Sequence, residues 1–377
     1  MTLKKGNAAI MTSYPSDQPI LLNPNRVKRA YTGGKLLDQW QGVEPATDSN
    51  MSEEWIVSTV EVTNIDRSPG EGLSTTTAED DQVISLRDII SSDPAGFLGK
   101  AHHARYGSQI GVLARAGDTN IRLVIQAHPD TQSARKYLNY AYGKSEAWYI
   151  LNCRNIGKET PHIYAGFKPG ITRDLWQSLF ESQDIPGMLD AMHKIPVKRG
   201  DGFFIRASMP HTIGPGVFFL ELHEPSDYIF RLEKKYFNIR TFLDDELHCG
   251  MGFERLFDCF DYATYTEKEI SDHIRVLPKV VSEGPGFTEF VLLSHEQTNC
   301  FAMRKVSVKE KYLLSNDSGH RILIAVEGRG RILAGPKIYQ IFRGQGIFVP
   351  AGLKKAIIET DHQGLEIVVG YPPRIGD

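Results

Sequence analysis

Runs of β-branched and aromatic residues, separated by polar turns, recur along most of the chain and predict a protein built mainly of β-strands. The first run begins at Glu53, where hydrophobic and polar residues come close to strict alternation. Later runs have the same character: QIGVLAR, RLVIQAHP, EAWYILNCR, PHIYAGF, GDGFFIRA, GVFFLELHE and DYIFRLE. Their close succession predicts an antiparallel, all-β fold.

Helical spacing of the hydrophobic residues is confined to short stretches. The clearest is TRDLWQSLFESQDIPGMLDAMHKI, in which Pro186 should divide two short helices, so we expect a small helical insertion at about 172–195. The first forty residues are polar and rich in Pro, Asn and Ser, and they predict an arm laid over a domain, with no assigned element.

Two segments far apart in the chain repeat one another. GDGFFIRASMPH at 200–211 aligns without a gap on GQGIFVPAGLKK at 344–355, which indicates an internal duplication, and 377 residues suit two domains. The expected organisation is an N-terminal arm (1–45), a first strand-rich domain that holds the helical insertion (46–240), a linker with partial helix (241–280) and a second strand-rich domain (281–377).

Each copy of the repeat resembles the second conserved box of the cupins, G(X)5PXG(X)2H. Cupins are jelly-roll barrels whose mouth can hold a metal or a ligand, so the resemblance implies two such barrels. The first copy ends in His211 where the box has its histidine, whereas the second copy has Lys355. We therefore expect a metal in the first barrel only.

Four side chains of the first barrel are candidate metal ligands. Gln126 and His128 are two residues apart, so on a strand they point to the same face. Glu146 opens the next strand and His211 follows the repeated turn, so the four donors can converge in the barrel mouth. Two imidazoles, a carboxylate and an amide oxygen suit Zn²⁺ or a similar borderline cation.

The segments QAHPD, GKSEAWYIL, the GD…H box and LELHEPSDYIFR, taken in order, resemble the motif series of type I mannose-6-phosphate isomerases. GGKLLDQW and SEEWIVS resemble the opening of that family. The resemblance implies a duplicated cupin with a helical insertion and one Zn²⁺ per chain, held by Gln126, His128, Glu146 and His211. It further implies an aldose–ketose isomerase that interconverts mannose 6-phosphate and fructose 6-phosphate through a cis-enediol.

Three further residues are candidates for catalysis. Glu221 matches the glutamate of the family's EIQ motif and can act as acid or base. Arg231 matches the arginine that follows SDxTYR and can hold an enediolate oxygen or a phosphate. Lys144 of GKSE is a candidate for the same work.

The chain departs from the family where the sugar phosphate is expected. The serine of LSxQxHP is Val124 here, and the lysine of PfLxKxLDA is missing from IGVLARAGDTN. Arg115 or Arg122 could replace that lysine, or the substrate could be a free hexose or another phosphosugar. Two other classes stay open at this point: a non-catalytic cupin that binds a metal and a sugar, and an iron-dependent cupin oxygenase.

The composition of the chain favours a small molecule as its binding partner. The net charge of -3 gives no electrostatic footprint for a nucleic acid, and no apolar run is long enough to span a membrane. The N-terminal residues lack the apolar stretch of a signal peptide, and the four cysteines lack metal-type spacing. We therefore expect a cytoplasmic protein with reduced thiols and a sugar or sugar phosphate as partner.

Overall fold

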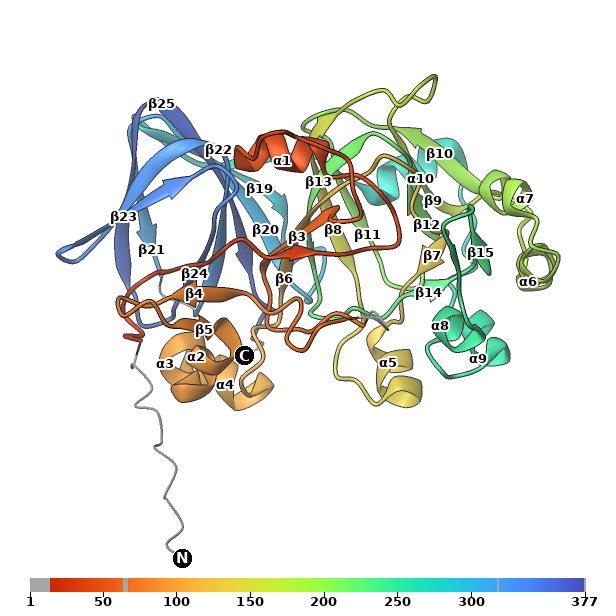
Figure 1. The fold of residues 1–377 in the computed structure, drawn as a ribbon, viewed down its shortest axis with the longest axis horizontal. Coiled ribbons are helices and arrows are strands. Elements are labelled where there is room, and N and C mark those ends of the chain that lie inside the picture. Colours follow the sequence, from red (N-terminus) through yellow and green to blue (C-terminus); the bar gives the residue numbers. More distant parts are fainter. Residues whose placement is uncertain (1–13, 64–66, 317–318, 376–377) are drawn as a thin grey trace, which may run out of the picture.

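The computed structural model describes residues 14–63, 67–316 and 319–375, which fold mainly into antiparallel β-sheets (Figure 1). This confirms the mainly β class. In Figure 1 the nine-stranded sheet lies at the left, the seven-stranded sheet in the middle and the five-stranded sheet toward the right.

The seven- and five-stranded sheets build the region that carries the candidate ligands. The seven-stranded sheet has the order β17 (Arg275–Val276), β11 (Gly202–Ile205), β8 (Glu146–Cys153), β13 (Val217–His223), β6 (Leu113–Asp118), β3 (Glu53–Val57) and β2 (Arg26–Val27). The five-stranded sheet has the order β10 (Met192–Pro196), β9 (His162–Phe167), β12 (His211–Ile213), β7 (Gln126–Ala127) and β14 (Phe230–Arg231).

These two sheets pack face to face, because their inward side chains form one buried apolar cluster. Trp148 of β8 and Phe219 of β13 belong to this cluster, and so do Ala165 of β9 and Phe230 of β14. Strand β13 is buried on both faces, and its side chains alternate: Phe219 faces this cluster, whereas Leu220 and Leu222 face the nine-stranded sheet. The period of two therefore turns Glu221 and His223 toward the space between the two sheets.

The nine-stranded sheet forms the second strand-rich region. Its strands are β1 (Ile20–Leu21), β24 (Gly346–Val349), β22 (Arg321–Ala334), β25 (Lys355–Tyr371), β20 (Ala302–Val308), β19 (Phe287–Leu293) and β18 (Lys279–Gly284), with β21 (Lys311–Ser315) on β25 and β23 (Lys337–Phe342) on β22. The two repeated segments each form a strand, β11 and β24, followed by a turn into the next strand. The duplication into two barrels stays a prediction.

The N-terminal arm contributes elements that its polar composition does not predict. Residues 1–13 of the expected arm lie outside the described residues. From residue 14 onward, β1 pairs with β24, β2 pairs with β3, and helix α1 (Lys35–Gln41) lies above the region where the sheets meet (Figure 1). Trp40 of α1 is buried and donates from Nε1 to the Val326 carbonyl at 2.8 Å, which connects the arm to β22.

The helices lie outside the sheets. Helices α6 (Arg173–Glu181) and α7 (Ile185–Asp190) form the expected insertion and lie at the right-hand end in Figure 1. The others are α2 (Leu86–Ser92), α3 (Pro94–Leu98), α4 (Lys100–Tyr106), α5 (Thr131–Leu138), α8 (Asp244–His248), α9 (Phe253–Asp258) and α10 (Glu267–Ile274). Two short hairpins, β4 (Thr75–Thr77) with β5 (Val83–Ser85) and β15 (Lys235–Tyr236) with β16 (Arg240–Thr241), complete the fold.

The segment expected as a linker, 241–280, packs closely on the first region. Leu247, Phe257 and Ile270 of its three helices belong to the apolar cluster between the seven- and five-stranded sheets. The domain boundaries themselves stay a prediction.

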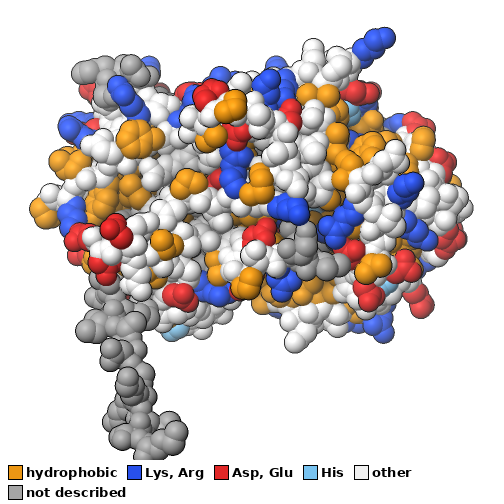
Figure 2. Space-filling view, in the orientation of Figure 1, with side chains coloured by type: hydrophobic (Ala, Val, Ile, Leu, Met, Phe, Trp, Pro, Cys, Tyr) orange, Lys and Arg blue, Asp and Glu red, His pale blue; other side chains and the backbone are white. Residues whose placement is uncertain are grey.

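The face of the molecule in Figure 2 carries acidic and basic side chains interspersed with each other and with hydrophobic ones. Within the described residues, no helix is long and apolar enough to cross a membrane.

Candidate metal centre and cavity

The four candidate ligands converge between the two facing sheets. Strand pairing places His211 of β12 opposite Gln126 of β7, and Glu146 begins β8 on the other sheet. Nε2 of His128 lies 2.9 Å from Oε1 of Glu146, and Nε2 of His211 lies 3.6 Å from Oε2. The Gln126 amide lies 3.2 Å from Nε2 of His211, and rotating its terminal amide exchanges nitrogen for oxygen at that place.

Both imidazoles are oriented for a metal. Nδ1 of His128 faces the carbonyl of Tyr228 at 2.9 Å, and Nδ1 of His211 faces that of Met209 at 3.0 Å. Each Nδ1–H therefore donates to the backbone and leaves a lone pair on Nε2, which is the usual support of a ligating histidine. Burial lowers the pKa of His128 to about 4, so this imidazole is neutral at pH 7.

The donor set fits a borderline divalent cation. Nε2 of His128 is buried and has no hydrogen-bond partner among the described residues, and Oε1 of Glu146 faces it while pairing with the ammonium of Lys144 at 3.1 Å. Ligand atoms of His128, Glu146 and His211 all lie within 4.8 Å of one another. A cation bound by these lone pairs would satisfy acceptors that otherwise face each other without a proton between them.

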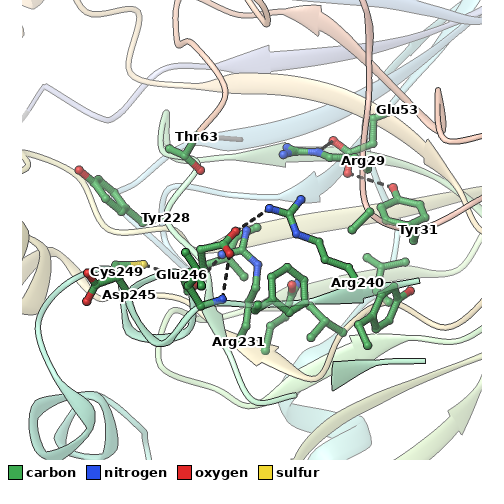
Figure 3. Close-up of a pocket in the computed structure, with 18 of the residues that line it drawn as sticks. Arg29, Tyr31, Glu53, Thr63, Tyr228, Arg231, Arg240, Asp245, Glu246 and Cys249 are labelled. Atoms are coloured by element: carbon green, nitrogen blue, oxygen red, sulfur yellow. Dashed lines mark hydrogen bonds and ion pairs between the residues drawn. The ribbon is translucent and has the colours of Figure 1, made fainter. Parts of the chain in front are cut away.

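A cavity of about 330 Å³ lies next to this cluster (Figure 3). Gln126 is the one candidate ligand in its wall, and neither Glu221 nor Lys144 lines it. Its walls include Glu53 of β3 and Arg115 of β6 on one sheet, and Gln126 of β7 and Arg231 of β14 on the other. Gln126 thus belongs both to the ligand set and to the cavity wall. The hairpin β15–β16 and helix α8 supply the outer wall.

Glu221 is fixed by a chain of buried ion pairs. Its Oε2 accepts from Nη2 of Arg115 at 2.7 Å, and Arg115 also pairs with Glu53. Arg29 continues the chain, from Nε to Glu53 at 2.7 Å and from Nη2 to Asp227 at 2.9 Å. Burial raises the pKa of Glu221 to about 8 although Arg115 opposes the shift, and Oε1 has no hydrogen-bond partner in the described part of the chain.

His223 stands beside Glu221 on the same face of β13. Nδ1 donates to the Glu224 carbonyl at 2.6 Å, so Nε2 carries the lone pair, and it lies 3.7 Å from Oε1 of Glu221. Nε2 of His223 also lacks a hydrogen-bond partner among residues that the structure describes. Strand pairing sets His223 opposite Glu146. Nε2 of His223 and Oε1 of Glu221 therefore lie next to the candidate ligands.

The other predicted residues fall in two places. Lys144 is buried within the ligand cluster, with Nζ 3.1 Å from Oε1 of Glu146. Arg231 lines the cavity, and its Nη1 donates to the Glu246 carbonyl at 2.8 Å.

The two arginines considered as replacements for the missing lysine differ. Arg115 lines the cavity, but its two terminal nitrogens, Nη1 and Nη2, already pair with the carboxylates of Glu53 and Glu221. Arg122 is held by Glu233 at 2.7 and 3.0 Å and is not part of the cavity wall. Val124, at the place of the family's serine, does line the cavity.

The sequence did not indicate the roles of Glu53, Arg29, Asp227 and His223. Glu53 carries one signal in retrospect, because it is a polar residue in a strand whose neighbours on the same face, Trp55 and Val57, are apolar. Arg29 and Asp227 are 198 residues apart, and no local pattern connects them.

Comparison with known proteins gives one consistent result. No family model matches the chain. The chain is 23% identical over 255 residues to "Mannose-6-phosphate isomerase ManA" of Bacillus subtilis, covering 67% of this chain and 73% of that protein. It is 24% identical over 266 residues to "Mannose-6-phosphate isomerase" of Streptococcus mutans, covering 69% and 73%. The solved structure of the mannose 6-phosphate isomerase from Bacillus subtilis has the same fold, with a TM-score of 0.72 at 18% identity over 94% of this chain and 99% of that one.

Proposed function

Because the chain is a divergent relative of the mannose-6-phosphate isomerases and shares their fold, we propose that it interconverts mannose 6-phosphate and fructose 6-phosphate through a cis-enediol. The observation that carries this proposal is the joint position of two groups of side chains. The buried group of potential metal ligands adjoins Gln126, which lines a cavity of sugar size, and the wall of that cavity also contains Arg115, the partner of Glu221.

Gln126, His128, Glu146 and His211 are the residues that would hold Zn²⁺. When bound, the ion supplies electrophilic stabilisation of the oxygen atoms of the substrate as negative charge develops on them. This ligand set has no cysteine, which is typical of catalytic rather than structural zinc.

Glu221 is the proposed proton carrier. Aldose–ketose isomerisation removes a proton from C2 and returns one to C1, so a single carboxylate oxygen that reaches both carbons can serve both transfers. Arg115 holds Oε2 of Glu221, which leaves Oε1 as the atom that exchanges the proton. Lys144 and Arg231 are proposed to hold developing negative charge or a phosphate.

A free hexose is the second candidate substrate. The observation that favours it is the apolar side chain of Val124 in the cavity wall, where relatives of this family have a hydroxyl. The two substrates can be compared directly.

The test is ketose formation by zinc-loaded protein from mannose 6-phosphate and from mannose. We expect turnover of the phosphosugar, and Glu221→Gln should lower kcat by roughly 10²- to 10⁴-fold while zinc content stays unchanged. The matched control is Glu289→Gln, which alters a buried glutamate paired with Arg304 in the second region and should leave kcat unchanged. Turnover of mannose alone would identify a free-hexose isomerase, and zinc binding without turnover of either sugar would refute the isomerase.

A further inference from the structure

The outer face of the second strand-rich region carries a continuous row of aliphatic side chains. Strands β21, β25, β22 and β23 are neighbours in this part of the nine-stranded sheet, which lies at the left in Figure 1. Strand pairing sets one aliphatic residue of each strand opposite the next, in the order Leu313, Ile357, Leu333 and Ile338. Residues that lie opposite one another in antiparallel strands point to the same face of the sheet. We call these four side chains the aliphatic row.

The aliphatic row faces solvent. Leu313 and Ile338 are each 56% exposed, and Ile357 is 39% exposed. The alternation of side chains along the strands explains this, because the adjacent residues Tyr312 and Ile358 point inward and belong to a buried apolar cluster. Hydrophobic side chains are visible at this end of the molecule in Figure 2. Single exposed aliphatic side chains are common on protein surfaces, but a contiguous row across four strands is typical of a surface that binds a partner.

A polar row lies beside the aliphatic row, two residues away along each strand. Its members, in the same order of strands, are Lys311, Glu359, Arg331 and Gln340. Arg331 donates from Nη2 to Oε2 of Glu359 at 2.8 Å, and the two side chains are 51% and 29% exposed. An apolar centre with a polar border is the usual composition of a protein–protein interface.

Both rows are complementary to themselves. A two-fold axis that lies between two such faces and runs along the strands reverses the order of the strands and keeps each row opposite its own copy. Leu313, at one end of the aliphatic row, then meets Ile338 of the second copy. In the polar row the carboxylate of Glu359 meets the guanidinium of Arg331 of the second copy, and no two like charges are brought opposite one another.

We propose that this face binds a second copy of the chain, so that the protein forms a symmetric dimer through the aliphatic and polar rows. Two sheets that pack with their strands nearly aligned are a common arrangement in β proteins. The dimer does not depend on the proposed function, because the rows lie in the second strand-rich region, whereas His128, Glu146 and His211 lie in the first.

Sedimentation equilibrium of the full-length protein tests the dimer directly. We expect a Kd on the order of 10 µM, since the two rows make an interface at the small end of the usual range of sizes. Leu313→Lys should raise this Kd roughly tenfold or more, because it places an unpaired charge against an aliphatic side chain. The matched control is Val280→Lys, since Val280 has a similar exposure of 54% but lies on β18 at the edge of the same sheet, and it should leave the Kd unchanged. A wild-type protein that stays monomeric at about 100 µM would overturn the proposal, and so would an unchanged Kd in Leu313→Lys.

A mixture of two variants tests the two-fold arrangement. Leu313 and Ile338 lie at opposite ends of the aliphatic row, three strand spacings or roughly 14 Å apart, so they cannot meet within one chain. Leu313→Lys and Ile338→Glu should each be monomeric where the wild type is dimeric, and both should keep the wild-type circular dichroism spectrum because the two positions are exposed. An equimolar mixture should form dimers again, because the ammonium introduced in one variant meets the carboxylate introduced in the other. Recovery of the dimer in the mixture would support the arrangement, and a mixture that stays monomeric would overturn it.

Discussion

Three buried atoms without hydrogen-bond partners in the described part of the chain lie between the two facing sheets, and all three can act as acceptors. They are Nε2 of His128, Oε1 of Glu221 and Nε2 of His223. Leaving such an atom unpaired costs about 1–3 kcal/mol, so three of them in one place require an explanation outside folding stability. A bound cation and substrate hydroxyl groups would supply the missing partners. At the scale of single residues, these unpaired atoms lower stability and are what a binding site between the two sheets would require.

Glu53 shows the contrasting case of a buried charge that stabilises the fold. Burial opposes its ionisation, but Arg115 and Arg29 lower its pKa from the usual 4.5 to about 2. A carboxyl group with a lowered folded-state pKa contributes stability above pH 4.5, and this contribution is lost as the pH falls toward 2. We expect Glu53→Gln to lower the free energy of unfolding by roughly 3 kcal/mol at pH 7, measured by urea denaturation.

The pH dependence provides the control for Glu53. At pH 3.5 the same substitution should cost roughly 1 kcal/mol less than at pH 7, because the wild-type unfolded state is then mostly protonated at this position. Glu61→Gln, which alters an exposed pair with Arg87, should change stability by under about 0.5 kcal/mol at both values. A cost for Glu53→Gln that does not vary with pH would contradict this account of the ion-pair chain.

At the scale of elements, the spacing of residues along a strand explains why the candidate metal ligands could be predicted. Gln126 and His128 share a face because they are two residues apart, and His211 follows the turn of the repeated box. Local sequence was therefore enough to select candidate ligands that the fold brings together. The chain of ion pairs through Arg115 could not be predicted from the sequence, because it joins β3, β6 and β13. The sequence of a single strand does not show which strands will be its neighbours in the sheet. Elements β1 and α1 were missed for a related reason, since short segments depend on tertiary contacts for their structure.

Helix α1 holds the N-terminal arm against both strand-rich regions. Trp40 packs edge-on against Phe218 at 5.6 Å, and its Nε1 donates to β22. Trp40→Ala should lower the free energy of unfolding by roughly 3–5 kcal/mol, because it leaves a large buried cavity. Trp40→Phe keeps most of the ring and should cost roughly 1–2 kcal/mol. Urea denaturation compares the two, and a loss below about 1 kcal/mol in Trp40→Ala would show that the arm does not secure the two regions.

At the scale of the whole molecule, the two strand-rich regions differ in their interiors. His128, Glu146 and His211 lie buried in the first region, and they form the one such group of potential metal ligands that the described residues contain. The interior of the nine-stranded sheet is apolar, and Lys355, at the repeat position of His211, is exposed. This contrast supports the prediction of a single metal per chain, with the second region serving to cover one face of the seven-stranded sheet.

We propose that this chain isomerises mannose 6-phosphate with the help of Zn²⁺. The most direct measurement is a titration of metal-free protein with Zn²⁺, in which bound zinc and fructose 6-phosphate formation are followed together. We expect activity to rise in proportion to bound zinc and to stop rising at one ion per chain. Full zinc occupancy without fructose 6-phosphate, or turnover that does not depend on zinc, would contradict it.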